Sequence, residues 1–171
     1  MNKRTGHTVS DRRPEVIAIL PNIRRFALSL TGNMADADDL MQATVERMLD
    51  RGLPDDAALL PYTLKTCRNL WIDEIRSQKV RQAATSSGDP LLSGSTTACG
   101  EQQALGEISL REVQAVLESM PEDQRAVLEL VAVEGFSYRQ AAEVLDIPIG
   151  TVMSRLARGR TTLAERLKMN D

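Results

Sequence analysis

Aromatic side chains are scarce in this chain: among 171 residues there are two Phe, two Tyr and one Trp. Hydrophobic residues nevertheless make up 42% of the sequence, so the core must be built from aliphatic side chains. A core of Leu, Val, Ile, Ala and Met favours helices over a β-sandwich or a β-barrel. The same hydrophobic content argues against a chain that is disordered throughout.

Residue types that bind metals or transfer protons are also few. The chain has one histidine, His7, and two cysteines, Cys67 and Cys99, without a CxxC or HExxH spacing. We therefore expect no metal site and no cofactor. No nucleophile–base arrangement, acid pair or phosphate-binding loop is evident, so an enzyme acting on a small-molecule substrate is the least favoured class. We expect Cys67 to be buried, as free cysteine usually is.

Long hydrophobic runs are absent as well. No apolar stretch reaches the ~18 residues that a membrane-spanning helix needs. The first residues are polar and lack the apolar segment of a signal peptide. These features predict a cytoplasmic protein with reduced thiols and no membrane insertion.

Positive charge is not in excess, because 21 Lys and Arg face 24 Asp and Glu, which gives a net charge of −3. A protein that binds DNA unaided usually carries a positive excess. Basic residues are nevertheless concentrated in two stretches: five against two acids in residues 62–81, and five against one acid in residues 151–168. This distribution predicts DNA contact only where another partner supplies most of the affinity.

The first half of the chain predicts three helices. Apolar residues recur at helical spacing in residues 15–30, between Asn33 and Gly52, and in residues 57–81. Asn33 is a suitable N-cap for the second helix, and Gly52 is a suitable end. Pro21 lies inside the first helix and is expected to kink it or restart it.

Residues 85–100 differ in composition from the segments beside them. They contain no Lys or Arg and are rich in Ser, Thr and Gly, which is typical of a flexible linker. No strand pattern and no internal repeat stand out. We therefore predict an all-α protein with two small helical domains, residues 1–84 and 105–171, joined by a flexible linker at residues 85–104.

A helix-turn-helix is the strongest local pattern in the second half. After a helix expected over residues 121–133, Ser137 and Gln140 fit a capping box that begins a short helix. Asp146 follows at a turn where a left-handed backbone is needed, which Asp tolerates better than most residues. The long last helix, residues 150–168, carries Thr, Ser and Arg side chains suited to a DNA groove. The alternative is a helical hairpin with a solvated basic face.

Four stretches of the sequence, taken in order, resemble the two-domain extracytoplasmic-function sigma factors of bacterial RNA polymerase. The similarity covers most of residues 14–168 apart from the linker, and it is nearest to the general-stress branch of that family. The stretches resemble the opening helix, the polymerase-binding helix, the minus-ten helix and the minus-thirty-five reader. They are residues 19–32, 36–42, 68–76 and 135–160.

The resemblance implies a role for specific residues. Docking on the clamp coiled coil of core RNA polymerase would fall to Asp38, Asp39, Leu40 and Gln42. Contacts with the minus-ten strand would fall to Asp55, Asp56, Asn69, Trp71, Asp73 and Arg76. Contacts with the minus-thirty-five duplex would fall to Tyr138, Arg139, Thr151, Val152, Ser154, Arg155 and Arg158.

Simpler interpretations of some of these residues stay open. The acidic residues 36–39 also fit an ordinary first turn, where the helix dipole favours negative charge. Trp71 shares a helical stripe with Leu64 and Cys67, so it could belong to the core. The family often has Trp seven positions before the minus-ten Asn, where this chain has Tyr62, and it often has Gly where this chain has Asp146.

The resemblance implies an alternative sigma factor that binds core RNA polymerase and directs promoter recognition, strand opening and transcription initiation. The implied partners are core RNA polymerase, promoter DNA and an anti-sigma factor. No ATP is expected to be used, because the chain has no Walker loop. One alternative is a sigma mimic that sequesters an anti-sigma factor, although a mimic should lose its basic DNA-facing residues. Another is a dimeric helix-turn-helix regulator that binds DNA unaided.

Overall fold

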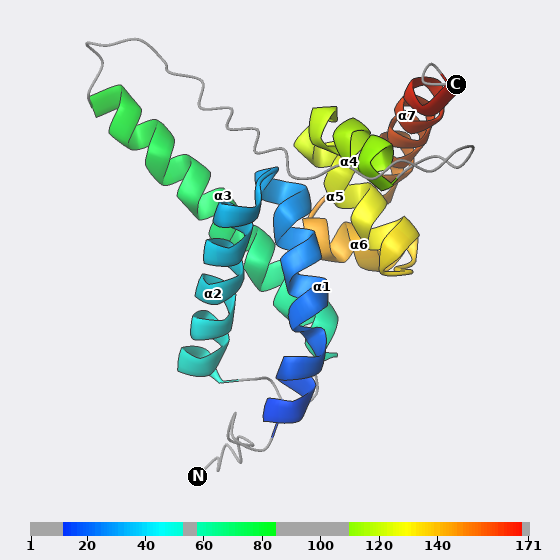
Figure 1. Ribbon diagram of the computed structural model, residues 1–171. Coiled ribbons are helices and arrows are strands. Elements are labelled where there is room, and N and C mark those ends of the chain that lie inside the picture. Colours follow the sequence, from blue (N-terminus) through cyan, green and yellow to red (C-terminus); the bar gives the residue numbers. More distant parts are fainter. Residues whose placement is uncertain (1–11, 53–57, 85–109, 169–171) are drawn as a thin grey trace.

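The computed structural model describes residues 12–52, 58–84 and 110–168, and every regular element within these ranges is a helix (Figure 1). The predicted all-α fold is therefore confirmed. The predicted linker and the candidate residues Asp55 and Asp56 lie outside the described residues. The elements are α1 (Arg13–Thr31), α2 (Met34–Arg51), α3 (Leu59–Ala84), α4 (Leu110–Ser119), α5 (Glu122–Leu128), the π-helical segment η1 (Glu129–Val133), α6 (Tyr138–Leu145) and α7 (Ile149–Lys168).

Local signals set the boundary between α1 and α2. Gly32 ends α1 in the left-handed conformation, at φ 77°, and its N–H donates to the Leu28 carbonyl. Asn33 caps α2 as predicted, because its side chain accepts a hydrogen bond of 2.9 Å from the Asp36 N–H. Of the kink or restart expected at Pro21, the restart is excluded, since α1 is a single helix with Pro21 inside it. The apolar face on both sides of Pro21 is buried, so packing holds the helix together.

The helix-turn-helix is also formed as predicted. Ser137 Oγ accepts from the Gln140 N–H at 3.2 Å, and Gln140 Oε1 accepts from the Ser137 N–H at 2.9 Å. Asp146 ends α6 in the left-handed region, at φ 50°. Ala142 is buried beneath the turn. These contacts fix the angle between α6 and α7 from local chemistry.

The helix predicted over residues 121–133 is interrupted by a change in winding. Pro121 is the N-cap of α5, and the chain then changes to a π-helix at Glu129. The Glu134 N–H donates to the Glu129 carbonyl at 2.9 Å, five residues back instead of four. A π-segment carries one more residue per turn, so it alters which side chains share a face. Apolar periodicity did not indicate this change.

The two helical units share one hydrophobic core. The buried cluster joins Ile23 and Phe26 of α1 and Leu64 of α3 to Val127 and Val152 of the second unit, all 0% exposed. Helix α5 packs on α1, and α6 packs on α3. Figure 1 shows α5 and α6 lying against the side of the first three helices. The units are therefore in contact through their apolar faces.

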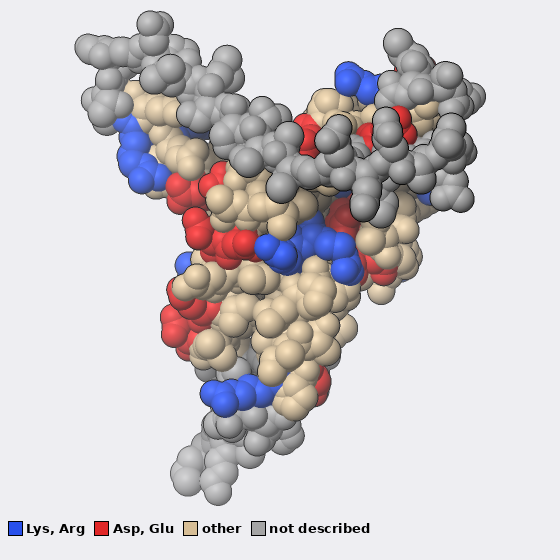
Figure 2. Space-filling model, viewed as in Figure 1, with Lys and Arg blue, Asp and Glu red and all other residues tan. Residues whose placement is uncertain are grey.

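The C-terminal end of α3 extends away from both units (Figure 1). All side chains from Arg76 to Ala83 are exposed, and three of them are basic: Arg76, Lys79 and Arg81. Figure 2 shows Lys and Arg side chains on the extended end of the helix. Across the described ranges, no helix combines the length and the apolar character that a membrane crossing requires.

Candidate nucleic-acid interface

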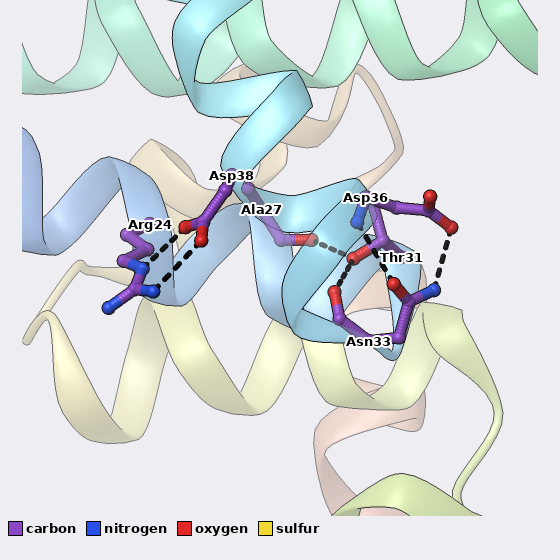
Figure 3. A network of polar contacts seen from close by, with 6 residues as sticks. All are labelled: Arg24, Ala27, Thr31, Asn33, Asp36 and Asp38. Atoms are coloured by element: carbon purple, nitrogen blue, oxygen red, sulfur yellow. Dashed lines mark hydrogen bonds and ion pairs between the residues drawn. The ribbon is translucent and has the colours of Figure 1, made fainter. Parts of the chain in front are cut away.

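An acidic face lies at the start of α2, where Figure 2 shows acidic side chains gathered along the helix. Asp38 accepts two hydrogen bonds from the Arg24 guanidinium, at 2.6 and 3.0 Å (Figure 3). These bonds hold the pKa of Asp38 below its usual value. Asp39 and Gln42 are exposed, and Gln42 Nε2 donates to Glu46 at 3.0 Å. This face offers carboxylates to a basic partner.

The junction before this face is held by a short polar network, also drawn in Figure 3. Thr31 Oγ1 lies 3.0 Å from the carbonyl oxygens of Ala27 and Asn33. Asn33 Nδ2 donates to Asp36 at 2.6 Å. The network fixes the direction in which α2 leaves the turn, so its acidic face is presented in one orientation.

Two of the candidate residues prove to be structural. Leu40 is 8% exposed and belongs to the shared core, so its side chain is not offered to a partner. Val152 is 0% exposed and packs in the same core, so it has no surface with which to contact a base. In this arrangement neither side chain is accessible to a partner, and their assigned contacts stay predictions.

The remaining minus-ten candidates lie on α3. Asn69, Asp73 and Arg76 are exposed. Arg76 Nη1 lies 3.9 Å from Asp73 Oδ1. Trp71 differs from them, because it is half-buried and packs against the shared core. Its indole N–H donates to Glu122 Oε1 of the second unit at 2.8 Å. The core interpretation of Trp71 therefore holds in part, because the ring packs on the core while its N–H bonds to the second unit. Its contact with the minus-ten strand stays a prediction.

The remaining minus-thirty-five candidates lie on α6 and α7. Tyr138, Arg139, Ser154 and Arg158 are exposed, and Thr151 is half-buried. Ser154 Oγ donates to the Thr151 carbonyl at 3.0 Å, within the helix. The exposed set is polar and basic and lies at the start of α6 and in the N-terminal half of α7, as a groove-binding unit requires.

Arg155 is set apart from these exposed residues. Its side chain is 29% exposed and pairs with Asp123 of α5 at 3.0 Å. It lines a crevice of about 110 Å³ between the two units, together with Arg68, Trp71 and Glu122. The structure therefore brings one minus-ten candidate and one minus-thirty-five candidate to the same place.

Arg68 is a charged residue of this crevice that was missing from the candidate set. It is half-buried on α3. Burial lowers its pKa, Asp146 opposes that change, and the positive charges of Arg155 and Arg76 add to it. Its position in the basic stretch 62–81 was the available signal. The basic composition of that stretch did not distinguish an arginine exposed to solvent from one half-buried between the two units.

A set of polar contacts crosses between the units, and sequence reasoning missed it entirely. Arg25 of α1 pairs with Glu134 at 2.7 Å and with Glu129 at 3.5 Å. Asn22 Nδ2 also donates to Glu134. Burial raises the pKa of Glu129, the charge of Glu134 raises it further, and Arg25 opposes the rise.

Arg125 of α5 makes a second crossing. Its Nε donates to the Ser29 carbonyl of α1 at 2.9 Å, and its Nη1 donates to the Met120 carbonyl at 3.0 Å. A Cβ at Gly32 would lie 3.2 Å from Arg125 Nη2, so the glycine also leaves room for this guanidinium. The partners are about a hundred residues apart, which no local pattern reveals.

Cys67 is buried on α3, as expected. Burial raises the pKa of its thiol to about 12. The thiol therefore stays protonated at neutral pH and is a poor nucleophile. Cys99 lies outside the described residues, and within those residues no group of three or more His, Cys, Asp or Glu is placed to hold a metal ion.

Comparisons with known proteins agree with this division into two units. The family model described as Sigma-70 region 2 matches residues 16–81, and the one described as Sigma-70, region 4 matches residues 110–163. The ECF RNA polymerase sigma factor EcfG of Rhodopseudomonas palustris is 32% identical over 157 residues, which is 91% of this chain and 84% of that protein. The ECF RNA polymerase sigma factor SigC of Mycobacterium tuberculosis is 31% identical over 153 residues, covering 88% of this chain and 80% of that protein.

A solved structure is similar over nearly the whole chain. It is the sigma factor RpoE of Bartonella quintana in complex with the anti-sigma factor NepR. The TM-score is 0.75 at 27% sequence identity, and the match covers 95% of this chain and 99% of that one. The likeness therefore extends over both helical units.

Proposed function

Because the chain belongs to the extracytoplasmic-function family of RNA polymerase sigma factors, we propose that its two helical units divide promoter recognition between them. The chain is a sigma factor that directs transcription initiation, and its family is non-enzymatic. We place core polymerase and the minus-ten element on residues 1–84, a linker at residues 85–104, and the minus-thirty-five element on residues 105–171. The observation that carries this division is the match of two sigma-70 regions, in order, to the two units.

Polymerase docking is assigned to the acidic face of α2. Asp38, Asp39 and Gln42 present carboxylate and amide groups to solvent from a helix whose start is fixed by Asn33. A preformed acidic face suits a basic coiled coil, because complementary charge steers the encounter and fixes the register. Leu40 supports this face from the core.

Minus-ten contact is assigned to α3. Asn69, Asp73 and Arg76 form its polar surface, and the basic end of the helix lies where a phosphate backbone can pass. Trp71 supplies an aromatic face for an unstacked base once its bond to Glu122 is released. Asp55 and Asp56 are proposed to hold a flipped base.

Minus-thirty-five contact is assigned to the start of α6 and the N-terminal half of α7. Thr151, Ser154, Arg155 and Arg158 would face base edges and phosphates in the major groove, where Arg binds guanine through two hydrogen bonds. Tyr138 and Arg139 begin α6 and would hold the DNA backbone. The exposed Arg158 and Arg160 also favour a true sigma factor over a mimic, which has no use for basic groove-facing residues.

An anti-sigma factor is proposed as a regulatory partner, and the cytoplasm, where RNA polymerase acts, as the location. The support is the similar sigma factor solved in complex with NepR. We further assign the chain to the general-stress branch, in line with its similarity to EcfG.

Run-off transcription tests the proposed function. Purified core polymerase is supplied with a pool of promoter fragments, with and without this protein, and specific transcripts are expected only when the protein is present. Arg155→Ala should weaken recognition of the minus-thirty-five element by about 1–3 kcal/mol. Asp39→Ala should weaken polymerase binding and leave the isolated minus-thirty-five contact intact. Absence of transcripts with a folded protein would overturn the proposal and favour the mimic.

A further inference from the structure

Two large apolar side chains lie exposed at the start of α7, the helix assigned to the minus-thirty-five element. Ile149 is 40% exposed and Met153 is 49% exposed. They are four residues apart, so they are neighbours on one face of the helix. Val152, by contrast, is 0% exposed and packs in the core. The apolar surface that the first turns of α7 offer to a partner is therefore that of Ile149 and Met153.

Met153 borders the part of α7 that is assigned to base edges. Each residue of an α-helix turns the chain through about 100°, so Met153 and Arg158 lie about 140° apart around the axis. In the first turns of α7 the strip between them holds Gly150, Ser154 and Ala157, which are all exposed. Side chains this small let the helix approach the floor of a groove closely. A long side chain at the border of the strip then reaches the bases.

The chemistry of the major groove indicates what an apolar side chain would contact there. Each base pair presents hydrogen-bonding atoms in that groove, and thymine adds an apolar C5-methyl group. Met is unbranched and has a polarizable sulfur, so it adapts to the shape of such a group. Removing the exposed surface of Met153 and a thymine methyl group from water together is favourable. A hydrogen-bonding base edge offers an apolar side chain no such gain.

We propose that Met153, with Ile149 one turn before it, contacts thymine methyl groups of the minus-thirty-five duplex and makes recognition depend on A·T pairs. The proposal rests on the proposed function, because it uses α7 as the helix that enters the major groove. It adds a second kind of contact to that function. Arg158 binds guanine or phosphate through hydrogen bonds, whereas Met153 selects thymine through apolar contact. The minus-thirty-five element is therefore expected to contain at least one A·T pair.

Replacing thymine by uracil tests this contact with a change of one methyl group. Uracil pairs with adenine as thymine does and keeps the same hydrogen-bonding atoms, so only the apolar contact is removed. The probe is a fluorescein-labelled promoter fragment that gives a transcript in the run-off assay. One form carries uracil at every thymine of the minus-thirty-five element, on both strands, and a control form carries uracil in the spacer instead. Binding of the holoenzyme, assembled from core polymerase and the full chain, is measured by anisotropy.

Three variants assign the contact to one side chain. Met153→Gln keeps the length of the side chain but makes its end polar, so it should lose the preference for thymine. Met153→Leu keeps an apolar side chain and should retain most of that preference. Met34→Gln is the matched control, because Met34 of α2 is 46% exposed and lies outside α7. Met, Gln and Leu have similar helix propensities, so all three variants should fold, and circular dichroism checks this.

The expected result is binding by the unaltered chain that is about fourfold weaker for each contacted methyl group removed, which is the effect of exposing one group of that size. Met34→Gln should show the same loss, and Met153→Gln should bind the thymine and uracil forms equally.

Equal binding of both forms by the unaltered chain would overturn the methyl contact. A preference for thymine that persists in Met153→Gln would overturn its assignment to Met153. A minus-thirty-five element without an A·T pair would overturn the proposal as well. Failure of the proposed function is distinguishable from these outcomes, because a folded chain would then give no transcript in the run-off assay.

Discussion

Arg24 and Arg25 are consecutive on α1 and make opposite kinds of contact. Arg24 pairs with Asp38 on the surface of its own unit, with both side chains 46% exposed. Arg25 pairs across the seam with carboxylates that are 3% and 15% exposed. Phe26, the next residue, is completely buried in the shared core. The contribution of an ion pair between the units to stability therefore depends on how deeply the partner of the arginine is buried. The distance between the two charges alone does not reveal that contribution.

The largest effect along these three residues should come from Phe26→Ala. Removing a fully buried aromatic ring costs about 3–5 kcal/mol, because it loses apolar burial and leaves a cavity. Phe26 belongs to the cluster that joins both units, so both should lose stability together. Urea unfolding followed by circular dichroism and by Trp71 fluorescence should show both transitions shifted by the same amount. A shift in one signal alone would mean that the two units unfold independently.

Arg25→Ala should come next, with a loss of about 1–3 kcal/mol in the free energy of unfolding, because it leaves buried carboxylates unpaired. The same substitution made in the Glu129→Gln/Glu134→Gln background should cost much less, since the negative charges are already gone. The difference is the coupling energy between Arg25 and the two carboxylates in a double-mutant cycle. Equal costs in both backgrounds would show that Arg25 acts by packing and not by charge.

A smaller effect should appear when the pH is lowered on the Arg25→Ala variant. The positive charge of Arg25 lowers the pKa of Glu129, which burial raises, so removing Arg25 lets that pKa rise further. A carboxyl group with a raised pKa takes up a proton in the folded state, and that state gains stability as the pH falls through the raised value. Between pH 7 and the ordinary value of 4.5, the urea midpoint of this variant should therefore rise relative to that of the unaltered chain. A midpoint that falls relative to the unaltered chain would contradict this sign.

Arg24→Ala should have the smallest effect. Both members of its pair are well exposed, and such pairs contribute little because water and salt screen them. We expect no measurable change in the urea midpoint. The bond that holds the pKa of Asp38 low is lost, so that pKa should return towards its usual value in a carboxyl titration by NMR. A clear loss of stability would mean that the acidic face of α2 has a structural role.

The features that were predictable from sequence are those whose chemistry is local. Asn33 caps α2 through a bond to Asp36, three residues ahead, and Ser137 and Gln140 bond to each other over the same distance. The left-handed Asp146 follows from the turn itself. The spacing of apolar residues was enough to find the helices, because the core lies on one face of each.

The polar contacts between the two helical units were not predictable, because the residues that make them are far apart in the chain. Arg25 and Glu134 look like ordinary surface charges at helical spacing, and only the tertiary packing buries one of them. Arg155 and Trp71 were assigned from a family pattern that concerns the promoter-bound state, whereas here both lie at the seam. Leu40 and Val152 are buried although they lie in stretches that resemble the family, because such a stretch contains core residues beside its surface residues.

The number of residues in the π-helical segment η1 determines how the helices after it are oriented. Removing one residue from η1 would restore ordinary α-helical winding. Each residue of an α-helix advances the chain by about 1.5 Å and turns it through about 100°. Such a deletion would rotate Glu134 away from Arg25 and change the orientation of α6 and α7 relative to α1. In this chain a single residue therefore sets the angle between α1 and the helix proposed to read DNA.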